Sequence, residues 1–322
     1  MDELTRRGLI GAAAATALAG RALSQTGAGD EVVPLWPKAI PGASGRPVAR
    51  KVEDHARTPG STDRWTTGID APALVVKRPA SPNGAAVLLV PGGGYGFLSY
   101  DNEGIEQARW LNALGVTCFI LLYRLPGEGW GDRHLVPLQD AQRAMRVIRA
   151  GATRFGVDAA RIAVLGFSAG GHLAGSLATR HGEAADAPVD AADRLSARPD
   201  LAGLIYPVIS MDAAITHQGS RDKLLGPAPD AAMLAAASVE RRVDAATPPV
   251  FLAHASDDRT VPVANSLAMY TAMLAANRPA ELHVFDEGGH GFGVRLAKAV
   301  PASAWPTLFA AYAARKGVFP HG

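Results

Sequence analysis

The chain has 322 residues, a formal net charge of +2 and a hydrophobic content of 48%. This length allows one large domain or two small ones, and the composition is sufficient for a sizeable core. Acidic and basic residues nearly balance and no long Lys or Arg run occurs, so the sequence gives no support for nucleic acid as a partner. Cys118 is the one cysteine, which excludes an intrachain disulfide.

The first 24 residues have the anatomy of a targeting segment. Arg6 and Arg7 precede an Ala-rich, mildly apolar stretch at 8–20, and small residues at 22–24 offer a cleavage site. This pattern resembles a bacterial twin-arginine export signal. The apolar stretch is shorter than the ~20 residues that span a bilayer. We expect residues 1–24 to be a signal peptide, and the processed protein to be periplasmic or secreted without membrane insertion. The alternative is a frayed helix on a cytoplasmic protein.

Residues 25–67 are rich in Pro, Gly and charge, with Trp36 and Trp65 as isolated aromatics. This composition predicts an extended N-terminal arm that packs on the edge of the domain formed by residues 68–322.

From residue 73 onward, apolar strand-like runs alternate with helix-like periodic segments. The predicted strands are 73–77, 85–90, 116–123, 161–165, 201–208, 250–255 and 281–286. The predicted helices are 103–114, 138–153, the segment 170–178, 263–275 and 303–315, while 210–231 is predicted to be loop-rich. Such alternation predicts an α/β fold with a doubly wound, mostly parallel sheet and helices on both faces. Catalytic side chains in such sheets lie at the carboxyl ends of the strands.

The pentapeptide Gly166–Gly170 fits G-x-S-x-G, in which a serine occupies a sharp strand-to-helix turn. The preceding β-branched run and the small residues that follow are the context that this motif requires. Ser168 is therefore a candidate nucleophile. The alternative is a Gly-rich turn without chemistry.

A serine hydroxyl needs a base, and the base needs an orienting acid. With this motif the acid and then the histidine follow the serine along the chain. His290 lies between glycines after the last predicted strand and is the favoured base. The competitors are less well placed: His172 is in the helix after the serine, His254 lies upstream of the candidate acids, His283 is within a strand, and His321 is in the tail.

Two aspartates compete for the acid, because both follow the strand at 250–255. Asp258 precedes Val261-Pro262 and the next helix, which favours it over Asp257. Either one can instead be a solvated turn carboxylate.

Hydrolysis also requires backbone N–H groups aimed at the oxyanion. The residue after the nucleophile, Ala169, is one predicted donor, and the loop at 91–96 with three consecutive glycines is expected to supply the others. This loop lacks phosphate-binding spacing, and the sequence has no metal-ligand motif, so no cofactor or metal is expected.

With these features in order, residues 73–315 resemble an α/β-hydrolase. The segments Pro91-Gly92-Gly93-Gly94-Tyr95, Leu138–Ala144, Tyr206–Met211 and His217–Gly226 are similar to those of the acetyl-xylan-esterase-like (xylanase-B-like) branch, which includes carbohydrate acetyl and feruloyl esterases. The resemblance implies the α/β-hydrolase fold without a large lid domain. It implies Ser168, Asp258 and His290 as the triad, and Gly93, Gly94 and Ala169 as the oxyanion donors. Pro91 stands where hormone-sensitive-lipase-like esterases have a histidine.

Several matching residues have open roles. Asp140 and Arg143 are expected to be a helix cap and an ion-pair partner. Ser220 and Arg221 either order a loop near the site or are purely structural. The loop aromatics either stack on sugar rings or pack within loops; they are Tyr95, Phe97, Tyr100 and Trp130.

The function predicted from these features is a serine carboxylester hydrolase that removes acetyl or other small acyl groups from carbohydrate. Its partner would be a small-molecule or oligosaccharide ester. The alternatives are a general short-chain carboxylesterase, a serine peptidase or amidase on the same fold, and a binding protein without catalysis, which would need none of the triad side chains.

Overall fold

A computed structural model describes residues 30–43 and 48–320. The predicted signal peptide, residues 1–24, and His321 lie outside this range. The central sheet has eight strands in the order β1-β4-β7-β5-β8-β9-β10-β11. Their bounds are β1 Glu31–Pro34, β4 Ala73–Lys77, β7 Thr117–Leu122, β5 Ala86–Val90, β8 Ile162–Phe167, β9 Leu201–Ile205, β10 Val250–Ala255 and β11 Ala280–Phe285. The pairings of β1 with β4 and of β4 with β7 are antiparallel, and the remaining five are parallel.

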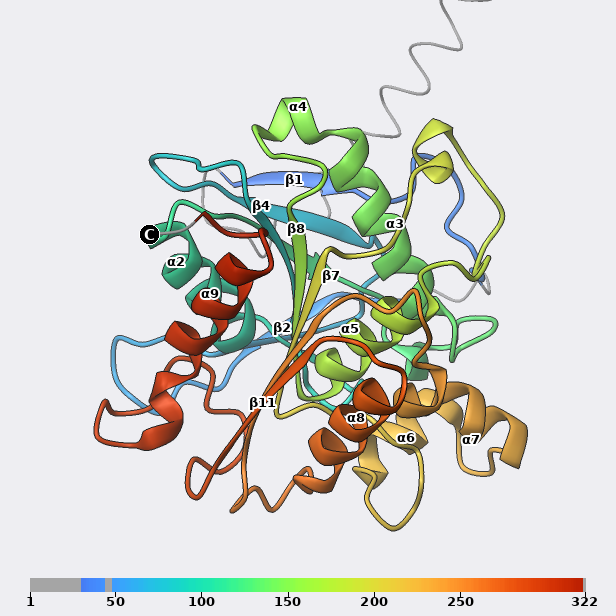
Figure 1. Ribbon diagram of the computed structural model, residues 1–322. Coiled ribbons are helices and arrows are strands. Elements are labelled where there is room, and N and C mark those ends of the chain that lie inside the picture. The colour runs from blue at the N-terminus through green and yellow to red at the C-terminus, as the bar shows by residue number, and fades with distance from the viewer. Residues whose placement is uncertain (1–29, 44–47, 321–322) are drawn as a thin grey trace, which may run out of the picture.

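Helices cover both faces of this sheet (Figure 1). On one face lie α2 (Glu106–Ala113) and α9 (Trp305–Arg315), and on the other lie α3 (Val136–Ala150), α5 (Ser168–Arg180) and α8 (Ala264–Ala275). The short helices are α4 (Ala152–Phe155), α6 (Gln218–Leu225) and α7 (Ala231–Ala237). The predicted doubly wound fold is confirmed, and it is the fold of α/β-hydrolases.

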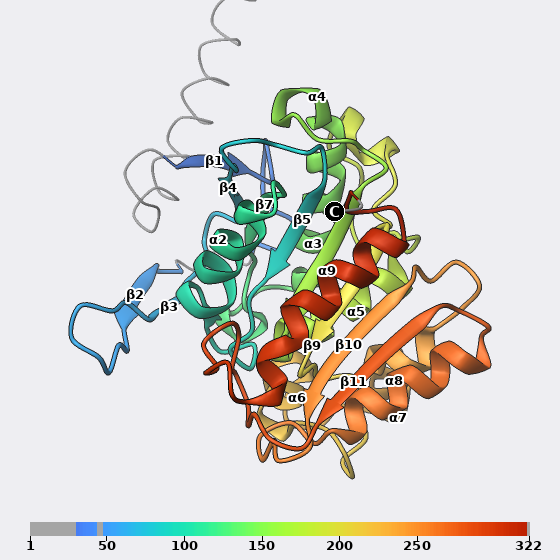
Figure 2. The same cartoon turned by 60° about the vertical axis from the view of Figure 1, so that its left-hand side comes forward.

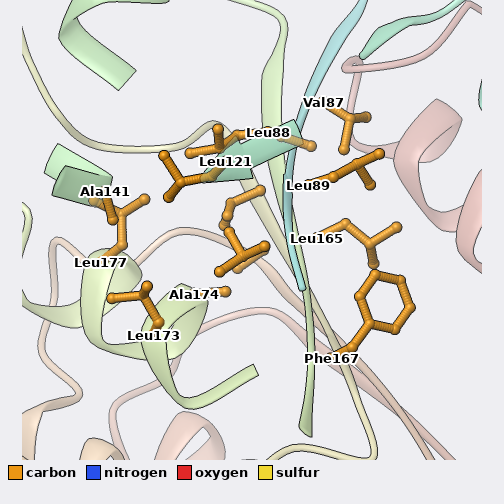
Figure 3. Close-up of a cluster of buried hydrophobic side chains, with 14 of the residues drawn as sticks. Val87, Leu88, Leu89, Leu121, Ala141, Leu165, Phe167, Leu173, Ala174 and Leu177 are labelled. Carbon is orange, nitrogen blue, oxygen red and sulfur yellow. The ribbon is translucent and has the colours of Figure 1, made fainter. Parts of the chain in front are cut away.

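The central strands are buried along their whole length because helices cover them on both sides. In β5, Leu88 points toward α3 and α5, whereas Val87 and Leu89 point to the opposite face (Figure 3). Phe167, at the end of β8, lies on the same side as Val87 (Figure 3). This alternation explains why the sequence shows continuous apolar runs, and it fixes the register of the strand that leads into Ser168.

A second, three-stranded sheet forms beside the main one. It contains β2 (Lys51–Asp54), β3 (Arg64–Thr67) and β6 (Leu98–Ser99) in the order β2-β3-β6. The hairpin β2–β3 projects from the body of the molecule (Figure 2). The described part of the predicted arm thus contributes one strand to the main sheet and two to this smaller sheet.

Three local predictions differ from the structure. The predicted helix 103–114 begins as a π-helical turn at Asp101–Ile105 before α2. The segment 210–231 contains α6, which its low hydrophobicity concealed. Asp140 is not a helix cap: it is fully buried within α3 and paired with Arg124. Arg143 is an ion-pair partner as predicted, because it binds Asp190 and Asp193.

In residues 30–43 and 48–320, no helix combines the length and apolar character needed to cross a bilayer.

Candidate active site

Ser168 occupies the tight junction between β8 and α5. Its φ angle is +53°, a left-handed conformation that a serine rarely adopts. The glycines around it permit this turn: a Cβ on Gly170 would lie 2.2 Å from the carbonyl oxygen of Val90 in the adjacent strand. Helix and strand therefore approach more closely than a side chain would allow, and the serine is held at the carboxyl edge of the sheet.

His290 lies in the loop after β11 and contacts this serine. Its Nε2 is 2.9 Å from Ser168 Oγ, and its Nδ1 is 2.6 Å from Asp258 Oδ2. The structure therefore brings together the three side chains that the sequence predicted for a Ser-His-Asp arrangement. The remaining candidate bases within the described residues, His172, His254 and His283, do not contact Ser168.

Asp258 is held firmly in the turn after β10. Its other oxygen, Oδ1, accepts the backbone N–H groups of Thr260 at 2.8 Å and Val261 at 2.9 Å. Burial opposes ionisation of this carboxyl, but hydrogen bonds from His254 and His290 hold its pKa well below the usual range. An anion is thus maintained where it can stabilise a charged imidazole.

Asp257, the competing acid, is exposed and lies outside this relay. Its Oδ1 accepts the N–H of Gly289 at 2.8 Å, next to His290. It braces the loop that carries the histidine.

His254 has a role that the sequence did not indicate. It is fully buried at the end of β10, and its Nε2 lies 3.0 Å from the Val261 carbonyl and 3.2 Å from Asp258 Oδ2. Because a carbonyl only accepts, Nε2 carries the proton, and Nδ1 accepts from the Ser266 hydroxyl at 2.8 Å. His254 therefore donates to the carboxylate oxygen that also binds His290.

The glycine loop after β5 lies beside Ser168. Gly93 has φ +121° and a Cβ there would lie 2.2 Å from the Phe97 carbonyl oxygen, so only glycine fits. Within the described part of the chain, no acceptor takes the N–H of Gly93 or Gly94, and both residues line the cleft in front of Ser168. Ala169 is in the first turn of α5, where backbone N–H groups have no partner within the helix.

Glu103 anchors this loop through its carboxyl group. Its Oε2 accepts the N–H of Gly92 at 2.7 Å, and its Oε1 accepts from the Tyr206 hydroxyl at 3.0 Å. Burial raises the pKa of the Glu103 carboxyl, and the hydrogen bonds oppose that shift. The Tyr206 ring in turn meets the His290 ring edge-on, with centroids 5.0 Å apart. One buried carboxyl group thus connects the glycine loop to the surroundings of the histidine.

A cleft of about 1430 Å³ opens in front of Ser168 and His290. One wall comes from residues 55–65 of the β2–β3 hairpin, which the sequence placed in an edge-packing arm. Trp65 stacks between His55 and Phe97, with ring centroids 3.9 Å apart on each side. The cleft is also lined by His217, which precedes α6, and by Gly219 and Lys223 within α6.

Of the other residues singled out from the sequence, some line the cleft and others are buried away from it. Phe97 lines the cleft, but Tyr95 and Tyr100 are buried, and Trp130 lies against Arg124 instead. Ser220 is buried and binds His217, whereas Arg221 reaches the Met211 carbonyl. Across residues 30–43 and 48–320, no group of three or more His, Cys, Asp or Glu side chains is placed to hold a metal ion.

Comparisons with known proteins agree with this geometry. Residues 79–273 match the BD-FAE family. The chain is 36% identical over 224 residues to an acetylxylan esterase of Xylanibacter ruminicola, covering 68% of this chain and 43% of that protein. It is 36% identical over 208 residues to the endo-1,4-beta-xylanase B of Butyrivibrio fibrisolvens, covering 65% of this chain and 32% of that protein. The chain thus spans less than half the length of these curated relatives.

A solved structure is similar over nearly the whole fold. The acetyl ester-xyloside bifunctional hydrolase from Caldicellulosiruptor lactoaceticus superposes with a TM-score of 0.76 at 34% identity, covering 90% of this chain and 97% of that one. The matched family segment and this structural likeness show that the chain belongs to the BD-FAE family, in the acetyl-xylan-esterase-like branch of the α/β-hydrolases.

Proposed function

We propose that this protein is a serine carboxylester hydrolase that removes acetyl or other small acyl groups from carbohydrate. The observation that carries the proposal is the continuous relay of Ser168, His290 and Asp258, with contacts of 2.9 and 2.6 Å. These are the distances at which a base accepts a serine proton and an acid orients the base.

In the proposed mechanism, Ser168 Oγ attacks the ester carbonyl while His290 Nε2 takes the hydroxyl proton. Asp258 stabilises the imidazolium through Nδ1. The N–H groups of Gly93, Gly94 and Ala169 receive the charge on the tetrahedral oxygen. Collapse of this intermediate breaks the carbon–oxygen ester bond, and His290 gives its proton to the leaving alcohol. Water, deprotonated by the same histidine, then attacks the acyl-enzyme and releases the acid.

The size of the cleft supports a carbohydrate substrate over a simple ester. Its volume of about 1430 Å³ exceeds the roughly 300–1,000 Å³ of typical small-molecule pockets. An acetyl group needs only a fraction of that space. The names of the acetylxylan esterase and the acetyl ester-xyloside hydrolase support the same substrate class.

The test compares wild type with Ser168→Ala on p-nitrophenyl acetate and then on acetylated xylan, acetylated pectin and feruloylated oligosaccharide. We expect wild type to release acetate from at least one polysaccharide and the variant to lose activity by several orders of magnitude. An inert wild type, or an active variant, would refute the esterase proposal. Activity on p-nitrophenyl acetate alone would favour a general short-chain carboxylesterase.

We also propose export through the twin-arginine route, because Arg6 and Arg7 precede an apolar Ala-rich stretch in the sequence. Fractionation of cells that express wild type or the Arg6→Lys, Arg7→Lys variant tests this. Unchanged periplasmic delivery of the variant would contradict it.

A further inference from the structure

His217 lies in the same cleft as Ser168 but outside the triad. It precedes α6 and caps that helix, because its Nδ1 accepts the N–H of Ser220 at 3.3 Å. The Ser220 hydroxyl lies 2.8 Å from the same nitrogen, and Ser220 is completely buried. The ring is thus fixed by two contacts on one side, both through Nδ1.

These contacts determine which ring nitrogen carries the proton. Nδ1 accepts the Ser220 N–H, so it is unprotonated. Burial and the nearby His290 lower the pKa of the His217 imidazole, against the opposing effect of Asp258, so the surroundings favour the same neutral ring that the Ser220 contact requires. A neutral ring with an unprotonated Nδ1 has its proton on Nε2. His217 is therefore a fixed N–H donor.

The His217 side chain lines the substrate space. In the described residues no acceptor binds Nε2, although the side chain is half-buried and lines the cleft. The ring lies against the glycine loop: a Cβ placed on Gly94 would be 3.8 Å from His217 Cε1. This uncharged donor has no partner among residues 30–43 and 48–320, and its ring lies beside the loop that would receive the ester. It can therefore donate to an oxygen of a bound molecule.

We propose that His217 Nε2–H donates a hydrogen bond to an oxygen in the alcohol part of the ester and so selects sugar esters over plain alkyl esters. The inference rests on the proposed function. The backbone amides of Gly93, Gly94 and Ala169 already serve the carbonyl oxygen in that mechanism. His217 approaches Gly94 from the side where a Cβ would project, which differs from the direction of its N–H.

A donor of this kind discriminates strongly between polar and apolar alcohol groups. A sugar hydroxyl or ring oxygen replaces water as the acceptor of Nε2–H, whereas an alkyl group leaves the donor buried without a partner. The preference therefore comes as much from rejecting apolar alcohols as from binding polar ones.

The experiment compares two acetates of secondary alcohols on six-membered rings: a monoacetate of methyl β-xyloside and cyclohexyl acetate. The measured quantity is the ratio of their kcat/KM values. His217→Asn keeps an oxygen that can cap α6 but no longer reaches the position of Nε2, and we expect it to lower the ratio about tenfold. His217→Gln restores a donor at that reach, and we expect it to recover part of the ratio. Gln218→Ala, an exposed neighbour on the same helix, is the matched control.

An unchanged ratio of the two kcat/KM values in His217→Asn would overturn the inference. This includes an equal loss on both acetates, which a helix-capping or oxyanion role would produce. If wild type hydrolyses neither acetate, the proposed function itself is overturned instead. The two failures are distinguished by the wild-type rates alone.

Discussion

His254 and His290 bind the same oxygen of Asp258, at 3.2 and 2.6 Å. His254 is therefore a second, buried support for the carboxylate. Removing it takes away one donor from an anion that burial already disfavours. We predict that His254→Leu lowers kcat about tenfold or more, and that His254→Gln, which retains a donor, loses less. Steady-state kinetics checks this, and equal losses in the two variants would indicate a purely structural role.

The two adjacent aspartates are predicted to differ greatly. Asp258→Asn removes the charge that orients His290 and should lower kcat by about 10⁴, as the loss of a triad acid does. Asp257→Asn weakens only the hydrogen bond to the N–H of Gly289 and should lower kcat a few-fold at most. The kcat of the two variants is the measurement. A larger loss in Asp257→Asn would move the acid assignment to that residue.

Glu103 is predicted to hold the glycine loop in position. Glu103→Ala leaves the N–H of Gly92 and the hydroxyl of Tyr206 without their acceptor. We expect kcat to fall about tenfold or more with a smaller change in KM, because the oxyanion donors lose their position. Glu103→Gln keeps the shape and one acceptor and should lie between. A change confined to thermal stability would contradict this view.

The stacked rings of His55, Trp65 and Phe97 are predicted to hold the glycine loop in place against the hairpin. Trp65 packs on Phe97, and the Phe97 ring lies close to Gly93, because its Cδ2 would be 2.8 Å from a Cβ placed on that glycine. Trp65→Ala should therefore lower kcat several-fold even on p-nitrophenyl acetate. Val52→Ala, at an exposed site in the same hairpin, provides the control. Identical kinetics for the two variants would show that the hairpin is only a wall.

His172 is predicted to make stability depend on pH. The ring is buried, accepts from the Tyr95 hydroxyl and donates to the Ala237 carbonyl. Burial lowers the pKa of His172 to about 4. Between about pH 6.5 and 4 the unfolded chain binds a proton that the folded protein does not, so stability falls as the pH falls through this window. The contribution is on the order of 3 kcal/mol.

Denaturant unfolding at pH 7 and pH 4.5 measures this effect, with His172→Gln as the comparison. We expect His172→Gln to have a lower free energy of unfolding than wild type at pH 7, but to lose less of that free energy between pH 7 and pH 4.5. A parallel loss in both proteins would assign the pH dependence to other groups.

The parts of the fold that sequence patterns predicted well are those with strong local signals. The strands at 73–77 and 250–255 have the predicted bounds because both are apolar runs between turn residues. Ser168 was recognisable because its strained turn demands glycines within a short distance. These features depend on neighbours in the chain.

The features that were missed depend on turns and strand pairings that form only in the folded chain. His254 has an ordinary strand context, and its role depends on where Asp258 folds back over it. The hairpin β2–β3 begins with an exposed, charged strand, β2, and its role emerges only when β3 pairs with β6, after the glycine loop. Neither relation has a spacing that a reader of the sequence can recognise.

The hairpin has a consequence for changing the substrate of this enzyme. Its tip supplies one wall of the cleft, whereas Ser168, Asp258 and His290 come from other elements. We therefore expect the tip at 55–63 to behave as an exchangeable module whose replacement alters which esters fit without altering how they are cleaved. Trp65 marks the inner limit of such an exchange, because beyond it the graft would reach the glycine loop that we propose as the source of the oxyanion donors. Directed evolution of specificity should accordingly accumulate changes on one side of that tryptophan and spare the other.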